Sequence, residues 1–289
     1  MSSMFVRITA GVGLFLAGAM SAQAVVSYST TGSIHAENFD SLAASGTNLT
    51  WTNDATLPGW FAYRSGVGGT AGARDAATWL AMTQYSADDG AGGSGFWSYG
   101  GSDARPSVNP NSDRALGSVP AGSPWGDFVQ ALVLRNDTGE TLTRFTLSYA
   151  GEQWRGGAGG GTRWQDFDFR VSSTFDADAD LPGNVIAGYE LTGVDTANPF
   201  LDFSGGGGSA VHDGNTAARR QLKTGTVYNL GWGPGDYLVL RWWHDNASGS
   251  DHGLAVDDLT FSAVPEPASL ALLSAAALLM RRRCANRSV

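Results

Sequence analysis

Alternation of apolar and polar residues is the feature that most restricts the fold of this chain. Phe145, Leu147 and Tyr149 alternate with Thr146 and Ser148. Further runs of β type cover residues 128–134, 167–171, 237–243 and 254–261. A period of two places alternate side chains on one face of a strand, whereas an amphipathic helix needs apolar residues three and four positions apart. No 12-residue stretch of the middle of the chain keeps such a helical stripe, so we predict an all-β fold.

Turn signals separate these runs at residues 136–139, 213–215 and 233–235. Short strands between such turns favour an antiparallel β-sandwich, which we predict to be a jelly roll. No internal repeat is apparent, so residues 25–262 are predicted to form one domain. This domain contains no cysteine and must therefore rely on its core rather than on disulfides.

The N-terminus has the pattern of a secretory signal peptide. Arg7 precedes the apolar run 8–20, and the small-x-small site Ala22-Gln23-Ala24 follows it. This order of basic, apolar and cleavage regions predicts a signal helix over residues 1–24, with cleavage after Ala24. We therefore expect the protein to be exported.

The C-terminus has three parts. Pro265-Glu266-Pro267 leads into the uncharged run 268–280, and Arg281-Arg282-Arg283 closes it. The apolar run has 13 residues, fewer than the roughly 20 that span a bilayer unaided, but the arginines mark an end that stays in the cytoplasm. We predict a hydrophobic helix that holds the chain in the inner membrane before processing.

This tail, residues 263–289, resembles the PEP-CTERM sorting signal. The resemblance implies recognition of Pro265, Glu266, Pro267 and the three arginines by exosortase, a membrane protease-transpeptidase. It further implies release or attachment at the cell surface or extracellular matrix of a Gram-negative bacterium, often one that makes exopolysaccharide.

The charge of the chain argues against nucleic acid as a partner. The formal net charge is −9, and the segment 25–262 has 13 basic against 26 acidic residues. A phosphate backbone needs a basic surface, so we predict no nucleic-acid binding.

The predicted last strand contains a change of phase. Leu254 and Val256 share one parity, whereas Leu259 and Phe261 share the other. A strand keeps its apolar residues on one face unless an extra residue is inserted, so the sequence predicts a bulge at Asp257-Asp258.

At least one of these two carboxylates is then placed near the buried face, where it needs a cation or several hydrogen-bond donors. Calcium accepts carboxylate and carbonyl oxygens in flexible geometry. Glu37 lies on an early strand that could neighbour the last one, so Glu37 and Asp257 are the predicted ligands of a structural calcium ion. The alternative is that Asp258 faces water and Asp257 bonds to the main chain. The Glu/Phe start and the Gly-Leu-Ala-Val-Asp-Asp finish resemble MAM-like and galactose-binding-like jelly rolls, which implies the same calcium position.

Two segments combine tryptophan with charged residues, around 151–164 and 242–258. Aromatic faces beside Arg, Glu and Gln suit sugar rings, which they stack on and hydrogen-bond. These segments resemble a pattern found in secreted bacterial proteins with PEP-CTERM tails. The predicted ligand-binding residues are Glu152, Trp154, Arg155, Trp164, Trp243, His244 and His252. The alternative is that most of the tryptophans belong to the core.

Enzymatic motifs are missing from the sequence. No G-x-S-x-G elbow is present, and the glutamates of the middle segment stand in no recognisable glycosidase motif. We predict a surface or matrix protein that is not an enzyme and that binds exopolysaccharide or another glycan. Two alternatives stay open: a structural or adhesive matrix protein without glycan binding, and a metal-dependent hydrolase that uses the segment His244–His252.

Overall fold

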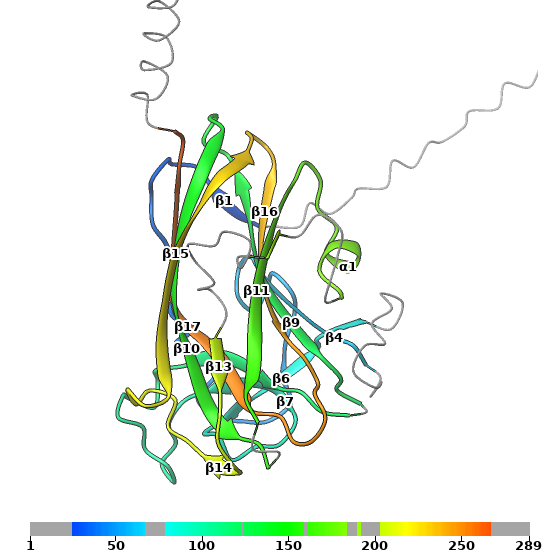
Figure 1. The fold of residues 1–289 in the computed structure, drawn as a ribbon, viewed down its shortest axis with the longest axis vertical. Helices are drawn as coiled ribbons and strands as arrows, with labels where there is room; N and C mark the ends of the chain where they lie inside the picture. Colours follow the sequence, from blue (N-terminus) through cyan, green and yellow to red (C-terminus); the bar gives the residue numbers. More distant parts are fainter. Residues whose placement is uncertain are drawn as a thin grey trace, which may run out of the picture.

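The computed structural model describes residues 25–66, 79–122, 124–158, 161–183, 190–191 and 203–266. The predicted signal segment 1–24 lies outside the described residues, as do Pro267, the run 268–280 and Arg281–Arg283. Two β-sheets make up nearly all of the regular structure (Figure 1). The prediction of an all-β sandwich is confirmed.

The first sheet, sheet A, has eight strands, and its hydrogen-bonded order is β12-β11-β16-β9-β4-β5. Two further strands join it at the sides, β1 on β9 and β13 on β11. Its strands are β1 (Val26–Tyr28), β4 (Trp60–Arg64), β5 (Leu80–Ala81), β9 (Phe128–Asn136), β11 (Arg163–Ser172), β12 (Glu190–Leu191), β13 (Phe203–Gly205) and β16 (Tyr237–His244).

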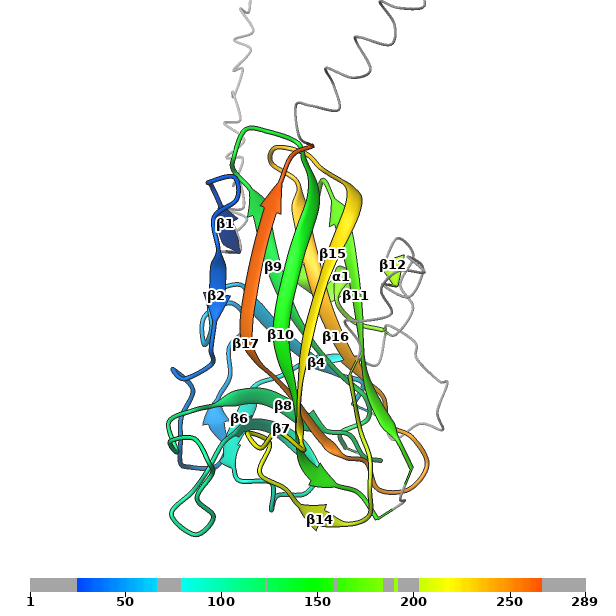
Figure 2. The ribbon, with the colours of Figure 1, turned by 60° about the vertical axis from the view of Figure 1, so that its left-hand side comes forward.

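The second sheet, sheet B, has nine strands in the order β14-β10-β17-β8-β7-β6-β3, with β15 also on β10 and β2 also on β17. Figure 2 shows β17, β10 and β15 side by side along the length of the molecule. Its strands are β2 (His35–Glu37), β3 (Leu49–Thr50), β6 (Gln84–Asp88), β7 (Gly95–Tyr99), β8 (Ala115–Val119), β10 (Leu142–Gly156), β14 (Ala210–Val211), β15 (Arg220–Trp232) and β17 (Gly253–Val264).

Most neighbouring strands are antiparallel, but β1 pairs with β9 and β6 pairs with β7 in parallel. The predicted boundary at residue 262 falls inside the last strand, because β17 continues to Val264. Among the described residues, no helix has the length and apolar character needed to cross a bilayer.

The main core lies between the sheets and is rich in aromatic rings. Trp242 of β16 stacks on Trp60 of β4 with ring centroids 5.6 Å apart, and it meets Tyr149 of β10 edge-on at 5.5 Å. Such pairs add specific ring contacts to the burial of large apolar area. Six of the ten tryptophans are buried, so the alternative of tryptophans as core residues holds for most of them.

A smaller cluster covers the outer face of sheet A. Phe61, Val129 and Val239 pack there against the segment that contains helix α1 (Ala177–Asp180). Asp176 caps this single turn, since its carboxylate accepts a hydrogen bond from the main-chain N–H of Asp178 at 3.1 Å.

The bulge predicted in the last strand is present. The pairing of β10 with β17 shifts register between Ser148 and Ala150, opposite Thr260 and Asp257, and Asp258 has a φ of 48°. The expected neighbourhood of early and last strands is also present, because β2 pairs with β17 and sets Glu37 opposite Leu259. The bulge turns Asp257 away from the main core, toward the outer face of sheet B.

Candidate functional site

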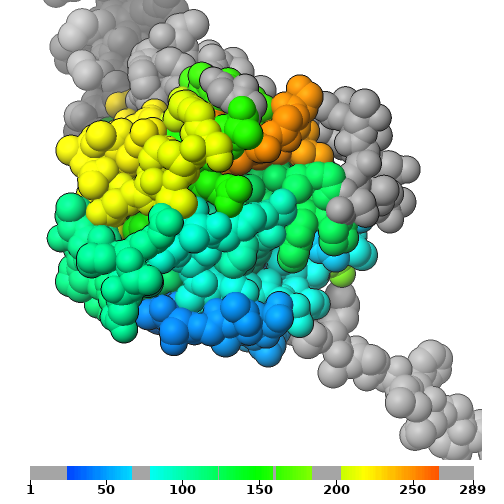
Figure 3. Space-filling model, turned by 90° about the horizontal axis from the view of Figure 1, so that it is seen from below, coloured from blue at the N-terminus to red at the C-terminus, as the bar shows by residue number. Residues whose placement is uncertain are grey.

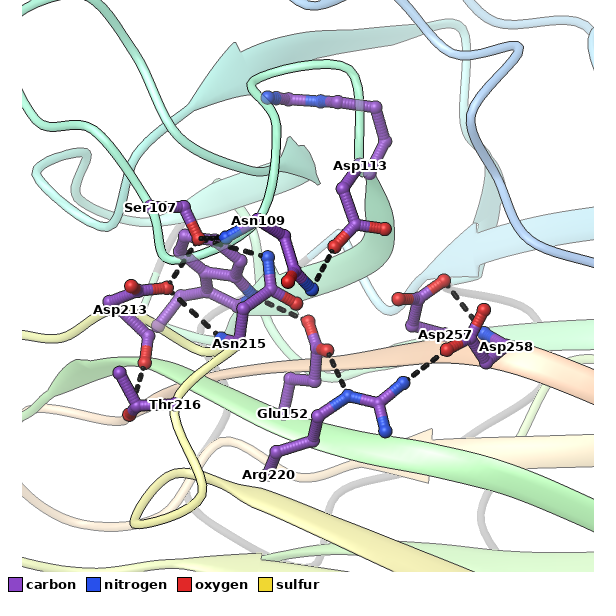
Figure 4. A network of polar contacts seen from close by, with 12 residues as sticks. Ser107, Asn109, Asp113, Glu152, Asp213, Asn215, Thr216, Arg220, Asp257 and Asp258 are labelled. Atoms are coloured by element: carbon purple, nitrogen blue, oxygen red, sulfur yellow. Dashed lines mark hydrogen bonds and ion pairs between the residues drawn. The ribbon is translucent and has the colours of Figure 1, made fainter.

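On the outer face of sheet B, two carboxylates are buried together. Glu152 of β10 and Asp257 of β17 are both at most 1% exposed. Glu152 accepts hydrogen bonds from the Trp154 indole at 2.9 Å and from Arg220 Nε at 3.1 Å. Arg220 also donates to Asp258, so its guanidinium bridges two acids (Figure 4).

Burial controls the protonation of this pair. Desolvation, opposed by the Trp154 and Arg220 hydrogen bonds, raises the pKa of Glu152 above its usual range. Desolvation, reinforced by the negative charges of Glu152 and Asp258, raises the pKa of Asp257 well above its usual range. At neutral pH, the two buried carboxyl groups therefore lie together because Arg220 supplies a positive charge and because bound protons reduce their negative charge.

Two loops cover this polar cluster from solvent. Asp213 accepts hydrogen bonds from Ser107 Oγ at 2.7 Å and from the Val108 N–H at 2.8 Å, which ties the loop after β14 to the loop after β7 (Figure 4). Beneath them, Trp154 stacks on Tyr99 with an interplanar angle of 3°. Glu152 and Trp154 are therefore largely interior residues, although Trp154 lines a small pocket of about 120 Å³ beside Ser107 and Asp213.

The two predicted calcium ligands lie on neighbouring strands but have different partners. Glu37 accepts a hydrogen bond from the Phe39 N–H at 2.8 Å, and the negative charge of Asp40 acts on it. Asp257 accepts one from the Asp258 N–H at 2.7 Å, and Asp258 is exposed. This agrees with the alternative of main-chain bonding by Asp257.

The part of the chain that the structure describes holds no group of three or more His, Cys, Asp or Glu side chains placed to hold a metal ion. Calcium takes six to eight oxygen ligands, so an ion at Glu37 and Asp257 would need main-chain carbonyls and water for the rest. Calcium therefore stays a prediction.

The two histidines of the segment 244–252 are also buried. His244 Nδ1 lies 3.0 Å from Ser118 Oγ, and burial lowers the pKa of His244 to about 3. His252 Nδ1 accepts from the Gly157 N–H at 2.6 Å, which leaves the ring proton on Nε2 for the Gly161 carbonyl at 2.7 Å. Burial also lowers the pKa of His252. Both rings are neutral hydrogen-bonding groups that fasten the ends of strands.

The remaining predicted ligand-binding residues lie nearer to solvent. Trp164 of β11 is 49% exposed, whereas Trp243 of β16 is half-buried and packs beside the outer cluster of sheet A. Arg155, at the end of β10, is half-buried and donates hydrogen bonds to the carbonyls of Ala91 and Gly92. Arg155 and Trp164 are therefore accessible to solvent, whereas most of the other predicted ligand-binding residues are buried.

Arg155 lies beside a pocket at the end of the sandwich, which we call the end pocket. Its volume is about 160 Å³, and segments 93–94, 119–122 and 249–251 line it together with Arg155. Figure 3 views the molecule from below, the end at which the loop between β16 and β17 (orange) lies. The volume is below the ~300 Å³ of common drug-sized pockets and several times the ~30 Å³ share of one water. It therefore suits one small polar group or ring.

Asp251 supplies a buried carboxylate beside the end pocket. Its side chain is buried, and Oδ1 accepts from Arg163 Nε at 2.8 Å. Oδ2 is also buried and has no hydrogen-bond partner among the described residues. Burial, opposed by Arg163, raises the pKa of Asp251 to about 6. Burying an acceptor without a donor costs free energy, so a hydrogen bond from a ligand or a water to this oxygen would be favourable.

Sequence reasoning considered Asp251 only as part of the possible metal-binding segment His244–His252 and did not predict it as a ligand-binding residue. Its burial depends on Gly157, whose missing side chain lets the 249–251 segment approach. A Cβ on Gly157 would lie 1.9 Å from the Ser250 carbonyl oxygen. The run of glycines after β10 was the available signal, but its long-range partner could not be read from the chain.

Comparison with known proteins identifies no family. No family model matches the chain, and no curated protein matches it. Among solved structures, it is similar to the CBM22-1 xylan-binding domain from Paenibacillus barcinonensis Xyn10C, with 12% identity, 83% of this chain and 99% of that chain covered, and a TM-score of 0.35.

Two further structures are comparable. The xylan-binding module CBM15 has 9% identity, coverage of 82% of this chain and 99% of that one, and a TM-score of 0.35. The K2 cleaved adhesin domain of Lys-gingipain has 14% identity, coverage of 80% and 99%, and a TM-score of 0.36. These low scores carry no conclusion about function, which has to be argued from the chain itself.

Proposed function

We propose that this protein is an exported, non-catalytic carbohydrate-binding protein of the bacterial cell surface or extracellular matrix. The observation that carries the proposal is the end pocket, which Arg155 and Asp251 line together and beside which the buried Oδ2 of Asp251 has no hydrogen-bond partner among the described residues. Because Oδ1 is paired with Arg163, Oδ2 would accept one sugar hydroxyl once the segment 249–251 shifts to admit it, and the Arg155 guanidinium would donate to further hydroxyl or ring oxygens. Neighbouring hydroxyls on a sugar ring match this arrangement.

The alternative of a metal-dependent hydrolase draws no support from its proposed residues. His244 and His252 are buried and hydrogen-bonded inside the sandwich, so neither meets a substrate from solvent. The alternative of a structural or adhesive matrix protein differs from our proposal in one respect, the absence of sugar binding. It is therefore an outcome of the binding test.

The test is calorimetric titration of the purified protein with a panel of monosaccharides and disaccharides. Asp251→Asn keeps the shape of the side chain but replaces one carboxylate oxygen by a donor, so we expect at least tenfold weaker binding of any sugar that the wild type binds. Asp103→Asn, an exposed change on another loop, is the matched control. Wild-type protein without affinity for any sugar, or equal affinity in Asp251→Asn, contradicts the end pocket.

Sorting by exosortase is proposed on the tail sequence alone. Pro265 and Glu266 follow the last strand directly, so the motif begins where the folded domain ends and remains reachable by a membrane enzyme. Co-expression with an exosortase and mass spectrometry of the mature C-terminus tests this. We expect cleavage near Pro265-Glu266-Pro267 in the wild type and an unprocessed chain when Glu266 is changed to Ala. An intact C-terminus in both proteins contradicts it.

A further inference from the structure

A second surface, on the outer face of sheet B, carries rows of hydroxyl groups. Three neighbouring strands contribute two each, and register sets them directly opposite one another. Thr146 lies between Thr226 and Ser262, and Ser148 lies between Thr224 and Thr260. We call these six residues the hydroxyl face. None of them is buried.

The hydroxyl face is ordered by its own contacts. Thr146 and Thr226 are joined by a hydrogen bond of 2.9 Å, and Ser148 and Thr224 by another of 2.9 Å. Strands lie about 4.8 Å apart, and alternate residues along a strand are about 6.8 Å apart. The result is a regular grid of groups that both donate and accept hydrogen bonds, held by the register of three paired strands.

A shallow groove of about 260 Å³ continues from the grid, lined by Arg144, Thr146, Thr226, Tyr228, Ser262 and Val264. Tyr228 is 57% exposed, so one side of its ring is open. No hydrogen bond or ion pair joins the Arg144 guanidinium to another of the described residues. The groove lining has a cation and no acid, although the whole chain has a net charge of −9.

We propose that this groove and the hydroxyl face bind an acidic polysaccharide, a chain of sugars that carries uronate carboxylates. Arg144 would hold a carboxylate through paired hydrogen bonds, and Tyr228 would stack on a sugar ring. The rows of Thr and Ser would exchange hydrogen bonds with hydroxyls of neighbouring sugars. Protein interfaces are richer in aromatic and apolar side chains at their centre, so a hydroxyl grid beside a cation favours a glycan as the occupant.

This surface is separate from the end pocket, and the inference rests on the proposed function only in taking a glycan as the ligand. A polymer lying over β15, β10 and β17 contacts the side of the sandwich, whereas the end pocket lies among the loops at its end. The two sites can therefore be disabled independently.

The test uses affinity gel electrophoresis of the full protein in polygalacturonate and in its carboxyl-reduced, neutral form. We expect binding to polygalacturonate, a loss of about tenfold in Arg144→Gln and a similar loss in Tyr228→Ala. With the neutral polymer, Arg144→Gln should match the wild type. Arg105→Gln removes one charge at an exposed position on another loop and should change polygalacturonate affinity by less than twofold.

Each outcome decides one site. The inference is overturned if the wild-type protein does not bind polygalacturonate, or if Arg144→Gln and Arg105→Gln lose equal affinity for it. Asp251→Asn should leave polygalacturonate binding unchanged. A protein that binds the polymer but no small sugar contradicts the end pocket alone, and the reverse result contradicts the hydroxyl face alone.

Discussion

The ion pair of Arg241 with Asp168 gives the sharpest stability prediction. Both residues are buried, and they lie opposite each other on β16 and β11. Arg241 Nε donates to one carboxylate oxygen at 2.7 Å and Nη2 to the other at 2.5 Å. Nη1 donates to the carbonyls of Leu181 and Gly183 at 2.9 and 2.7 Å. The guanidinium thus fastens the segment after α1 to sheet A.

Asp168→Asn keeps the shape of the side chain but leaves the buried guanidinium without its counter-charge. Removing one partner of such a pair costs about 3–5 kcal/mol of unfolding free energy. For a domain of this size, 1 kcal/mol corresponds to roughly 2–4 °C in Tm, so the melting temperature should fall by about 6–20 °C.

The assay is urea denaturation and thermal melting followed by circular dichroism. Asp137→Asn is the matched control, because Asp137 pairs with Arg135 at 3.0 Å on the surface and such pairs contribute at most about 1 kcal/mol. Replacing both buried partners, Asp168→Leu with Arg241→Met, should recover much of the loss. A cost below 1 kcal/mol for Asp168→Asn would refute the reasoning.

Three further predictions concern the end pocket and the acid cluster. Burial raises the pKa of Asp251 to about 6, so sugar binding should strengthen as pH rises through about 6 and the carboxyl loses its proton. Calorimetric titrations at pH 5 and 7 check this, and Asp251→Asn should show no such change. Because that pKa is higher in the folded state, the same group stabilises the fold at low pH and loses this contribution as pH rises through 6. If calcium is bound, a chelator should lower Tm. The loss of stability should be about 2.7 kcal/mol when the calcium concentration before chelation was a hundredfold its Kd. Asp257→Ala should abolish the difference, and identical melts of the wild type with and without chelator argue against the ion. Gly157→Ala, whose Cβ would meet the Ser250 carbonyl oxygen at 1.9 Å, should displace the 249–251 segment and weaken sugar binding in calorimetry, whereas Gly208→Ala, with no atom within 4 Å, should bind normally.

The strands could be predicted from the local alternation of apolar and polar residues. Alternation at 145–149 places Phe145, Leu147 and Tyr149 in the core, and the change of parity at Asp257-Asp258 locates the bulge. Both follow from the two-residue period of a strand, which needs no knowledge of distant contacts.

The site was less predictable because its environment comes from distant segments. Glu152 and Trp154 read as surface groups suited to sugars, but Asp213 and Ser107 join two loops over them, 106 residues apart in the chain. Tyr228 and Arg144 face one groove only because β15 pairs with β10. Neither arrangement leaves a signal in the local order of residues.

The position of β17 affects how the domain would carry force. This last strand lies inside sheet B between β10 on one side and β8 and β2 on the other, and it ends at Val264. A tether attached at residue 265 would pull β17 along its own axis. Its hydrogen bonds to both neighbours would then be loaded together in shear, rather than one at a time as at a peeled edge. A protein held at a cell surface through this end would resist being drawn out by flow.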